Sequence, residues 1–236
     1  MIGALLPSGA VGAEVYDDPQ EARLHPAEEA AIARAVESRR REFTTVRHCA
    51  RTALRELGHD YEPLVPGHRG APGWPAGVVG SMTHCAGFRA AAVARVGVLA
   101  SLGIDAEPDL PLLPGMLASV SLPTERQRVD ELAAHRPGVA WDRLLFSAKE
   151  AVYKTWFPLT GLLLDFPQAE ILIDPGGTFR AVLLVPGPVV GGRAVTVFHG
   201  RWAAGGGLLA TAIGVPQPAR AISRTSAARE FTPNLL

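Results

Sequence analysis

Hydrophobic and polar positions along the chain predict the same succession twice, helices followed by strands. Residues 26–57 have helical spacing in two pieces, with Pro26 suited to a first helical position and Gly58 to the end. Short apolar runs bounded by turn residues predict strands. The further expected elements are helices over 123–135 and 139–157 and strands over 78–83, 88–96, 98–107, 169–173, 179–185, 194–202 and 208–215.

This double succession indicates an α+β fold with two similar lobes, each with helices packed on a small antiparallel sheet. A proline-rich connector over 108–123 separates the two halves, so we expect an N-terminal lobe over 1–108 and a C-terminal lobe over 109–215. Residues 216–236 are expected to form a disordered tail.

Composition weighs against several classes of protein. The 236 residues carry 23 basic and 23 acidic side chains, a balance that argues against nucleic acid as a partner. No apolar run reaches the ~18–20 residues needed to span a bilayer. The first residues lack the basic start of a secretion signal. We therefore expect a cytoplasmic protein with no membrane or nucleic-acid partner. We also expect a monomer, which composition does not address.

The two cysteines, Cys49 and Cys85, each follow a histidine, which raises the question of a zinc site. Neighbouring residues do not share a helix face and alternate across a strand, so each pair is poorly arranged for one metal. The chain has no Cys-x-x-Cys spacing. We expect free thiols, buried or half-buried.

Lysine is rare in this chain: 21 of the 23 basic residues are arginine, and Lys149 and Lys154 are the two lysines. A compact ammonium that can lose its proton differs chemically from a guanidinium, so this segment is where we expect chemistry. Glu150 precedes Lys154 by four residues and shares its helix face. A surface ion pair is the alternative interpretation.

Residues 34–51 contain six arginines and two acids, among them Arg39 and Arg47. Guanidinium groups bind phosphate through two hydrogen bonds, so the segment is a candidate phosphate clamp; a solvated helix face is the alternative. Two further polar segments follow, the rigid loop 67–75 with Arg69, and a strand end at Thr83 and His84. Either segment alone could be structural or could bind a polar ligand.

Asp105 and Glu107 lie two apart on an expected strand, so both carboxylates point to one face. Two like charges held together are unfavourable unless a cation lies between them. Hard oxygen ligands of this kind suit Mg²⁺, which often bridges substrate phosphates. A solvated pair of acids at a strand end is the alternative.

These blocks, in this order, resemble the 4'-phosphopantetheinyl transferases of the two-lobed, single-chain type, which activate siderophore, nonribosomal-peptide and polyketide synthases. The resemblance covers about residues 26–215. Its most specific part is the pairing of Asp-x-Glu at 105–107 with Lys-Glu-x-x-x-Lys at 149–154. It implies an active site between the lobes that moves phosphopantetheine from coenzyme A to a serine of apo acyl, aryl or peptidyl carrier proteins and releases 3',5'-ADP.

The resemblance also implies residue roles. Glu150 and Lys154 would be catalytic, with Glu150 as the base for the serine hydroxyl, although a metal-bound water could take that proton. Mg²⁺, for which Mn²⁺ can substitute, would lie at Asp105, Ala106, Glu107 and Glu150. Arg39, Arg47 and Arg69 would hold the phosphates of coenzyme A, and Lys149 and Lys154 would lie near them. In all, coenzyme A would contact the residues Arg39, Arg47, Arg69, Thr83, His84, Asp105, Lys149, Glu150, Lys154 and Leu164.

Two other functions remain open from the residues. One is a different Mg²⁺-dependent enzyme acting on phosphoanhydrides, such as a nucleotide hydrolase, although the chain has no Gly-x-x-x-x-Gly-Lys-Ser/Thr loop. The other is a non-catalytic module that binds partners on the same fold. The intact acidic and lysine residues argue against the second.

Overall fold

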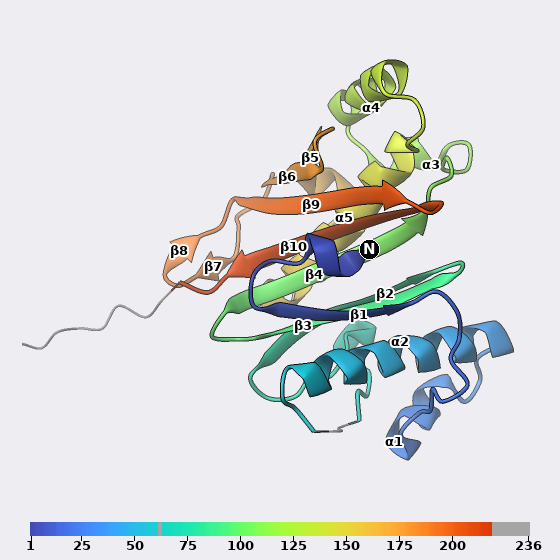
Figure 1. Cartoon of the computed structure of the whole chain (residues 1–236). Helices are drawn as coiled ribbons and strands as arrows, with labels where there is room; N and C mark the ends of the chain where they lie inside the picture. Colours follow the sequence, from blue (N-terminus) through green and yellow to red (C-terminus); the bar gives the residue numbers. More distant parts are fainter. Residues whose placement is uncertain (61–62, 219–236) are drawn as a thin grey trace, which may run out of the picture.

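The first sheet of the protein carries its helix on one face. The computed structural model describes residues 1–60 and 63–218. Strands β1 (Ala10–Val15), β2 (Val78–Cys85) and β3 (Phe88–Arg95) pair antiparallel in the order β1-β3-β2. Helix α2 (Glu37–Glu56) packs on this sheet, with the short α1 (Pro26–Glu29) beyond it (Figure 1). Three single turns, η1 (Ile2–Leu5), η2 (Ala30–Ile32) and η3 (His68–Gly70), complete this part.

The second sheet has five antiparallel strands in the order β4-β10-β9-β6-β5. The long helix α5 (Trp141–Thr160) packs on β4 (Leu99–Pro108) and β10 (Leu208–Pro216). The remaining elements are α3 (Met116–Val120), α4 (Pro123–His135), η4 (Phe166–Gln168), β5 (Ala169–Asp174), β6 (Thr178–Leu183), β9 (Val197–Gly205) and the small hairpin β7 (Val189–Val190) and β8 (Arg193–Ala194).

The α+β prediction is confirmed, and the expected helices and strands are present with small shifts at their ends. The expected lobe boundary lies after residue 108, whereas the two sheets divide before β4. Strand β4 pairs with β10 and so belongs to the second sheet. We therefore place the division between β3 and β4. The predicted disordered tail falls mostly on residues 219–236, which lie outside the described residues.

From Ser101 onward, the residues of strand β4 alternate between two environments. Leu102, Ile104 and Ala106 point into a central apolar cluster shared with β3, β10 and η1. The intervening residues face α5: Ser101 donates a hydrogen bond to the Thr155 carbonyl, and Asp105 contacts the same helix. This alternation, expected for any strand, carries the acidic side chains toward the helix.

Gly103 brings α5 directly against β4. A Cβ atom at this position would lie 2.3 Å from the Ala151 carbonyl oxygen and 2.3 Å from Thr155 Oγ1. Any side chain here would push the helix away from the strand. The missing side chain therefore sets the distance between α5 and the carboxylate two residues further along β4.

Strands β2 and β4 join the two sheets without a backbone ladder. Instead, the Ile104 amide donates to Ser81 Oγ at 3.0 Å and the Ala106 amide donates to Thr83 Oγ1 at 3.0 Å. The constant offset shows that the strands run side by side in the same direction. The hydroxyls thus satisfy strand amides that would otherwise be buried without a partner.

Cys49 is buried and Cys85 is half-buried, and both are free, as predicted. Burial raises the pKa of both thiols to about 12. Within residues 1–60 and 63–218, no helix is both long and apolar enough to cross a membrane.

Candidate active site

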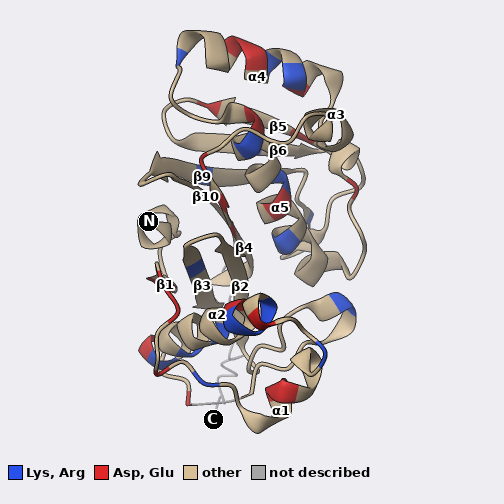
Figure 2. Ribbon diagram, turned by 90° about the vertical axis from the view of Figure 1, so that its right-hand side faces the viewer, with Lys and Arg blue, Asp and Glu red and all other residues tan. Residues whose placement is uncertain are grey.

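A cleft of about 750 Å³ lies between the two lobes, within the size range of ligand sites. Arg39 of α2, Arg69 of η3 and His84 of β2 line one side, and Glu150 and Lys154 of α5 line the other. Figure 2 shows several charged residues on α2 and α5 and fewer on the strands between them. Arg47 of α2 lines the cleft as well, so six predicted site residues from both lobes meet there.

The Asp105 carboxylate is buried next to Lys154 and does not itself line the cleft. Its Oδ1 accepts a hydrogen bond from Lys154 Nζ at 2.7 Å and one from the Thr83 hydroxyl at 3.1 Å. Its Oδ2 is buried and has no hydrogen-bond partner among the described residues. A buried oxygen without a partner is unfavourable, so this atom is poised to bind a cation or donor.

Glu107 and Glu150 complete the acidic group. Burial raises the pKa of Glu107, and the Asp105 charge adds to the effect, while Arg143 opposes it. Burial also raises the pKa of Glu150; Lys154 lowers it and Asp105 raises it further. Both carboxylates are therefore within electrostatic reach of Asp105, and their mutual repulsion favours a bound cation.

Mg²⁺ is compatible with these residues, although they do not form a ready-made cage. Over the described part of the chain, no three acidic, histidine or cysteine side chains are gathered as a metal site. Arg143 Nη1 holds Glu107 Oε2 at 3.0 Å, and the Ala106 side chain points into the apolar core, so this residue could contribute only backbone atoms. Carboxylate oxygens with one unpartnered atom nevertheless match the hard-ligand preference of Mg²⁺.

On the opposite side, His84 is held as a neutral ring. Arg39 Nη1 donates to His84 Nε2 at 2.8 Å, which requires an unprotonated acceptor nitrogen. Burial lowers the pKa of His84, and the Arg39 charge lowers it further. Glu42 lies 3.3 Å from the same nitrogen and partly offsets the positive charge. Arg39 itself is half-exposed and can reach a ligand.

The other two predicted arginines differ in their surroundings. Arg47 is buried, and its guanidinium donates to the Leu64 carbonyl at 3.0 Å and to the Phe43 carbonyl at 3.4 Å. Burial lowers the pKa of Arg47 to about 10. Arg69 is exposed, in the left-handed backbone region at φ 54°, which is unusual for a residue with a side chain. Arg69 is thus the freer of the two to bind an anion.

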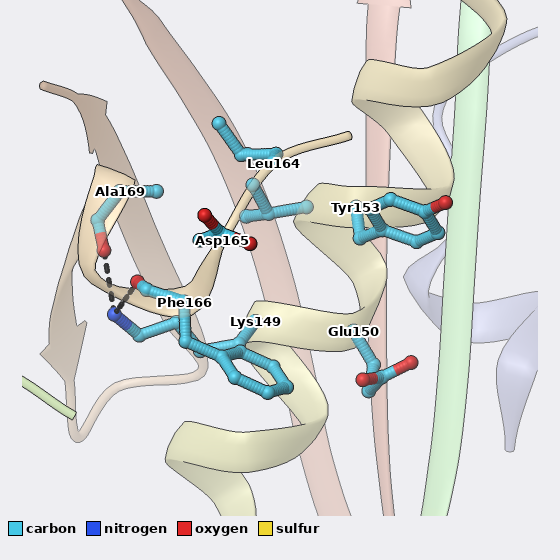
Figure 3. A pocket seen from close by; sticks show the side chains of 8 residues that line it. Lys149, Glu150, Tyr153, Leu164, Asp165, Phe166 and Ala169 are labelled. Atoms are coloured by element: carbon cyan, nitrogen blue, oxygen red, sulfur yellow. Dashed lines mark hydrogen bonds between the residues drawn. The ribbon is translucent and has the colours of Figure 1, made fainter. Parts of the chain in front are cut away.

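Asp105, Ala106 and Glu107 do not line the main cleft, and three other predicted residues also lie away from it. Thr83 is buried behind the cleft, where its hydroxyl already serves Asp105 and the Ala106 amide. Leu164 lines a second cavity of about 230 Å³ on the other side of Glu150 and Tyr153 (Figure 3). The Lys149 ammonium is buried and points away from Glu150.

The expected contact of Lys149 with phosphates has no support in this geometry. Its Nζ donates to the carbonyl oxygens of Phe166 and Ala169 and pairs with Glu125 Oε1 at 2.8 Å. Lys149 and Lys154 are five residues apart and so occupy different faces of α5.

Sequence reasoning did not identify Arg143, which holds Glu107 and also donates to the carbonyls of Leu110 and Pro111. A signal was present, because Arg143 lies seven residues before Glu150 and shares its face of α5.

Two family models match the chain in succession. Residues 27–94 match the 4'-phosphopantetheinyl transferase N-terminal domain. Residues 101–199 match the 4'-phosphopantetheinyl transferase superfamily. The chain belongs to this superfamily. The two matched ranges meet between β3 and β4, where the sheets also divide.

Curated relatives agree over most of the chain. The 4'-phosphopantetheinyl transferase Svp of Streptomyces mobaraensis is 62% identical over 93% of this chain and 91% of the relative. The transferase Npt of Nocardia iowensis is 50% identical over 90% of this chain and 99% of its own. The transferase PptT of Mycobacterium tuberculosis is 46% identical over 85% of this chain and 90% of the relative. The chain is therefore an enzyme that transfers phosphopantetheine to carrier proteins, in a family that uses coenzyme A and Mg²⁺.

Proposed function

We propose that this transferase takes phosphopantetheine from coenzyme A in the cleft between its lobes, with Mg²⁺, and attaches it to a serine of apo carrier proteins of siderophore, nonribosomal-peptide or polyketide synthases. The observation that carries the proposal is the meeting of two sets of groups in one cleft. Arg39, Arg69 and His84 come from the first lobe, and Glu150 and Lys154 come from the second.

The phosphates of coenzyme A suit the positive side of the cleft. Coenzyme A carries a 3'-phosphate and a pyrophosphate, and guanidinium groups bind such oxygens through paired hydrogen bonds. Arg39 and Arg69 are exposed enough to do so, and His84 can take up a proton when a dianion replaces Glu42 as its neighbour. Arg47 also lines the cleft and would add its charge from a buried position, with Nε and Nη1 already bound to backbone carbonyls.

Asp105, Glu107 and Glu150 would hold Mg²⁺ beside the pyrophosphate. When bound, the ion neutralises the negative charge that develops during phosphoryl transfer. The unpartnered Asp105 Oδ2 supports this assignment. Glu107 would have to exchange its Arg143 partner for the ion.

The chain's own residues would supply the proton transfer and the fixed cation. The serine oxygen of the carrier forms a bond to the phosphorus that bears pantetheine, the bond from that phosphorus to the oxygen of 3',5'-ADP breaks, and Glu150 takes the serine proton. Burial raises the pKa of Glu150, which makes it a better proton acceptor than an exposed carboxylate. Lys154, at the Asp105 side of the cleft, would donate to the phosphate oxygens as charge moves onto the leaving group.

The second cavity suits the uncharged arm of coenzyme A. It shares Glu150 and Tyr153 with the main cleft and is otherwise lined mainly by apolar side chains, including Leu164 and Phe166 (Figure 3). An arm placed there would leave the pyrophosphate next to Glu150 and Lys154. Leu164 would then contact the arm.

One assay tests the proposed function. The enzyme is incubated with coenzyme A, Mg²⁺ and an apo carrier protein, and the carrier is weighed by mass spectrometry. The expected result is the added mass of one phosphopantetheine, with release of 3',5'-ADP. Turnover without a carrier would support a nucleotide hydrolase, and an unmodified carrier with no turnover would support a binding module. Fractionation and size-exclusion chromatography test the expected cytoplasmic location and monomeric state.

Arg39→Ala and Arg69→Ala are each expected to weaken coenzyme A binding more than they lower the transfer rate of the coenzyme A-bound enzyme. The reason is that both arginines would already bind phosphates of coenzyme A before transfer begins. At least one variant should lose its effect when dephospho-coenzyme A replaces coenzyme A, since the 3'-phosphate is then absent. Calorimetry with both ligands measures this. Arg55→Ala, at the far end of α2, is the matched control and should change binding by less than about 0.5 kcal/mol. Equal losses with both ligands would show that neither arginine contacts the 3'-phosphate.

Lys154→Arg is expected to lower single-turnover transfer at saturating coenzyme A by at least ten-fold, or ~1.4 kcal/mol in barrier. The ammonium lies 2.7 Å from Asp105 Oδ1, and the longer, planar guanidinium cannot keep that position and still reach the phosphates. Thermal unfolding of the variant serves as the folding control. A wild-type rate in the folded variant would show that any cation suffices.

A further inference from the structure

Lys149 and Glu125 form an ion pair in the interior of the second lobe, apart from the cleft. Lys149 Nζ lies 2.8 Å from Glu125 Oε1, and the two side chains are 1% and 0% exposed. Burial lowers the pKa of Lys149, and the Glu125 charge opposes this effect. Taking two charges out of water is costly, so a pair of this kind calls for an explanation beyond stability.

The hydrogen bonds of the pair reach the η4 turn and strand β5, as well as the first turn of α4 itself. Lys149, on α5, donates to the carbonyl oxygens of Phe166 and Ala169, at 2.9 Å and 2.5 Å, which flank the η4 turn (Figure 3). Glu125, on α4, accepts from the Leu122 amide at 2.7 Å and the Ile171 amide at 2.6 Å. The pair therefore fixes α4, η4 and the start of β5 to α5.

The segment fixed in this way is one wall of the second cavity. Residues 164–166 and Ala169 form that wall, and Glu150, Val152 and Tyr153 on α5 form the other. Lys149 connects the two walls: it belongs to α5, which forms one wall, and its ammonium binds Phe166 and Ala169 of the opposite wall (Figure 3). The width of the cavity thus depends on the length and direction of one side chain.

We propose that Lys149 and Glu125 are positioning residues that set the width of this cavity for the uncharged pantetheine arm of the donor. The proposal rests on the proposed function, because it takes coenzyme A as the ligand. It replaces the phosphate contact expected for Lys149. The two lysines then serve different parts of the same ligand, Lys154 the phosphates and Lys149, indirectly, the arm.

The geometry also explains why a lysine occurs here in a chain that otherwise uses arginine. An ammonium has three donors, and Lys149 has three acceptors: two carbonyl oxygens and one carboxylate oxygen. A guanidinium is longer and planar, with five donors in a fixed fork. It would leave donors unsatisfied in this interior and would push the η4 turn outward.

The test compares two ligands that differ by the arm. Dissociation constants for coenzyme A and for 3',5'-ADP are measured by calorimetry with Mg²⁺ for wild type, Lys149→Met and Glu125→Gln. The expected result is that Lys149→Met weakens coenzyme A binding by at least about ten-fold, because a misplaced wall no longer fits the arm. Binding of 3',5'-ADP should stay within about two-fold, since its contacts lie in the other cleft.

Glu125→Gln keeps the shape of the side chain and carries the test if Lys149→Met does not fold; it should show the same selective loss. Arg128→Gln is the matched control, because the Arg128–Glu170 contact at 2.9 Å also joins α4 to β5 but is partly exposed. It should leave both affinities unchanged.

Two results would overturn the proposal. Equal weakening of both ligands would show that Lys149 contacts the phosphates, and unchanged affinities in folded variants would show that the pair acts on stability alone. Failure of the proposed function looks different, since the wild-type enzyme would then transfer no phosphopantetheine to a carrier.

Discussion

Asp105→Asn is expected to lower phosphopantetheine transfer by about 10³-fold or more, because loss of a metal ligand removes several kcal/mol of charge stabilisation. Asp105 has three roles. Its Oδ1 pairs with Lys154 and accepts a hydrogen bond from the Thr83 hydroxyl, and its buried Oδ2 has no hydrogen-bond partner among the described residues. An amide keeps the shape but presents no charge to a cation. Mass spectrometry of the carrier protein measures the rate.

The control for this prediction is Asp130→Asn on the exposed side of α4, which should transfer at the wild-type rate. Thermal unfolding shows whether Asp105→Asn remains folded with the Lys154 ammonium less well paired. EDTA should stop the wild-type enzyme, and Mg²⁺ or Mn²⁺ should restore it. Full activity in EDTA, or a wild-type rate in folded Asp105→Asn, would rule out the metal site.

Glu150→Gln is expected to slow single-turnover transfer by about 10²–10⁴-fold, the usual contribution of a general base. The carboxylate lies where the two cavities meet, and both include it in their lining. Glutamine has the same size and cannot accept the serine proton. The measurement is rapid-quench transfer at saturating coenzyme A and carrier.

A lower affinity for Mg²⁺ should accompany the slower transfer, since Glu150 is also a proposed ligand. Raising the Mg²⁺ concentration should restore binding but not the rate. If high Mg²⁺ restores the full rate, Glu150 holds the ion and another group takes the proton.

Local signals in the sequence were sufficient for most elements of the fold. Helix α4 occupies the predicted residues 123–135, and its start is marked locally by a proline at the first position and an acidic residue in the first turn. Strand β1 was not predicted, because every residue from Ala10 to Val15 is half-buried and the strand lacks an alternating pattern. The assignment of β4 to the second sheet depends on its pairing with β10, about a hundred residues away, which no local pattern reports.

The candidate site was predictable wherever the spacing of two residues decides that they share a face of one helix or strand. Two-residue spacing places Asp105 and Glu107 on one face of β4, and four-residue spacing places Glu150 and Lys154 on one face of α5. That these two faces meet was implied by the resemblance to the transferases and not by the spacing. The same spacing rule separates Lys149 from Lys154, yet the rarity of lysine suggested a shared role. The partner that explains Lys149 is Glu125, on another helix, and only tertiary packing brings it within 2.8 Å.

The hydroxyl contacts between β2 and β4 have a mechanical consequence. A backbone ladder resists shear along its whole length. The hydrogen bonds described across this junction are two from amides to the hydroxyls of Ser81 and Thr83 and one from the Thr83 hydroxyl to Asp105 Oδ1. A polyanion bound to both lobes would act as a brace across it, and a ligand that binds only the folded state adds stability by mass action. Amide hydrogen exchange at Ile104 and Ala106 should therefore slow when coenzyme A binds, because small sliding movements of one sheet against the other become rarer.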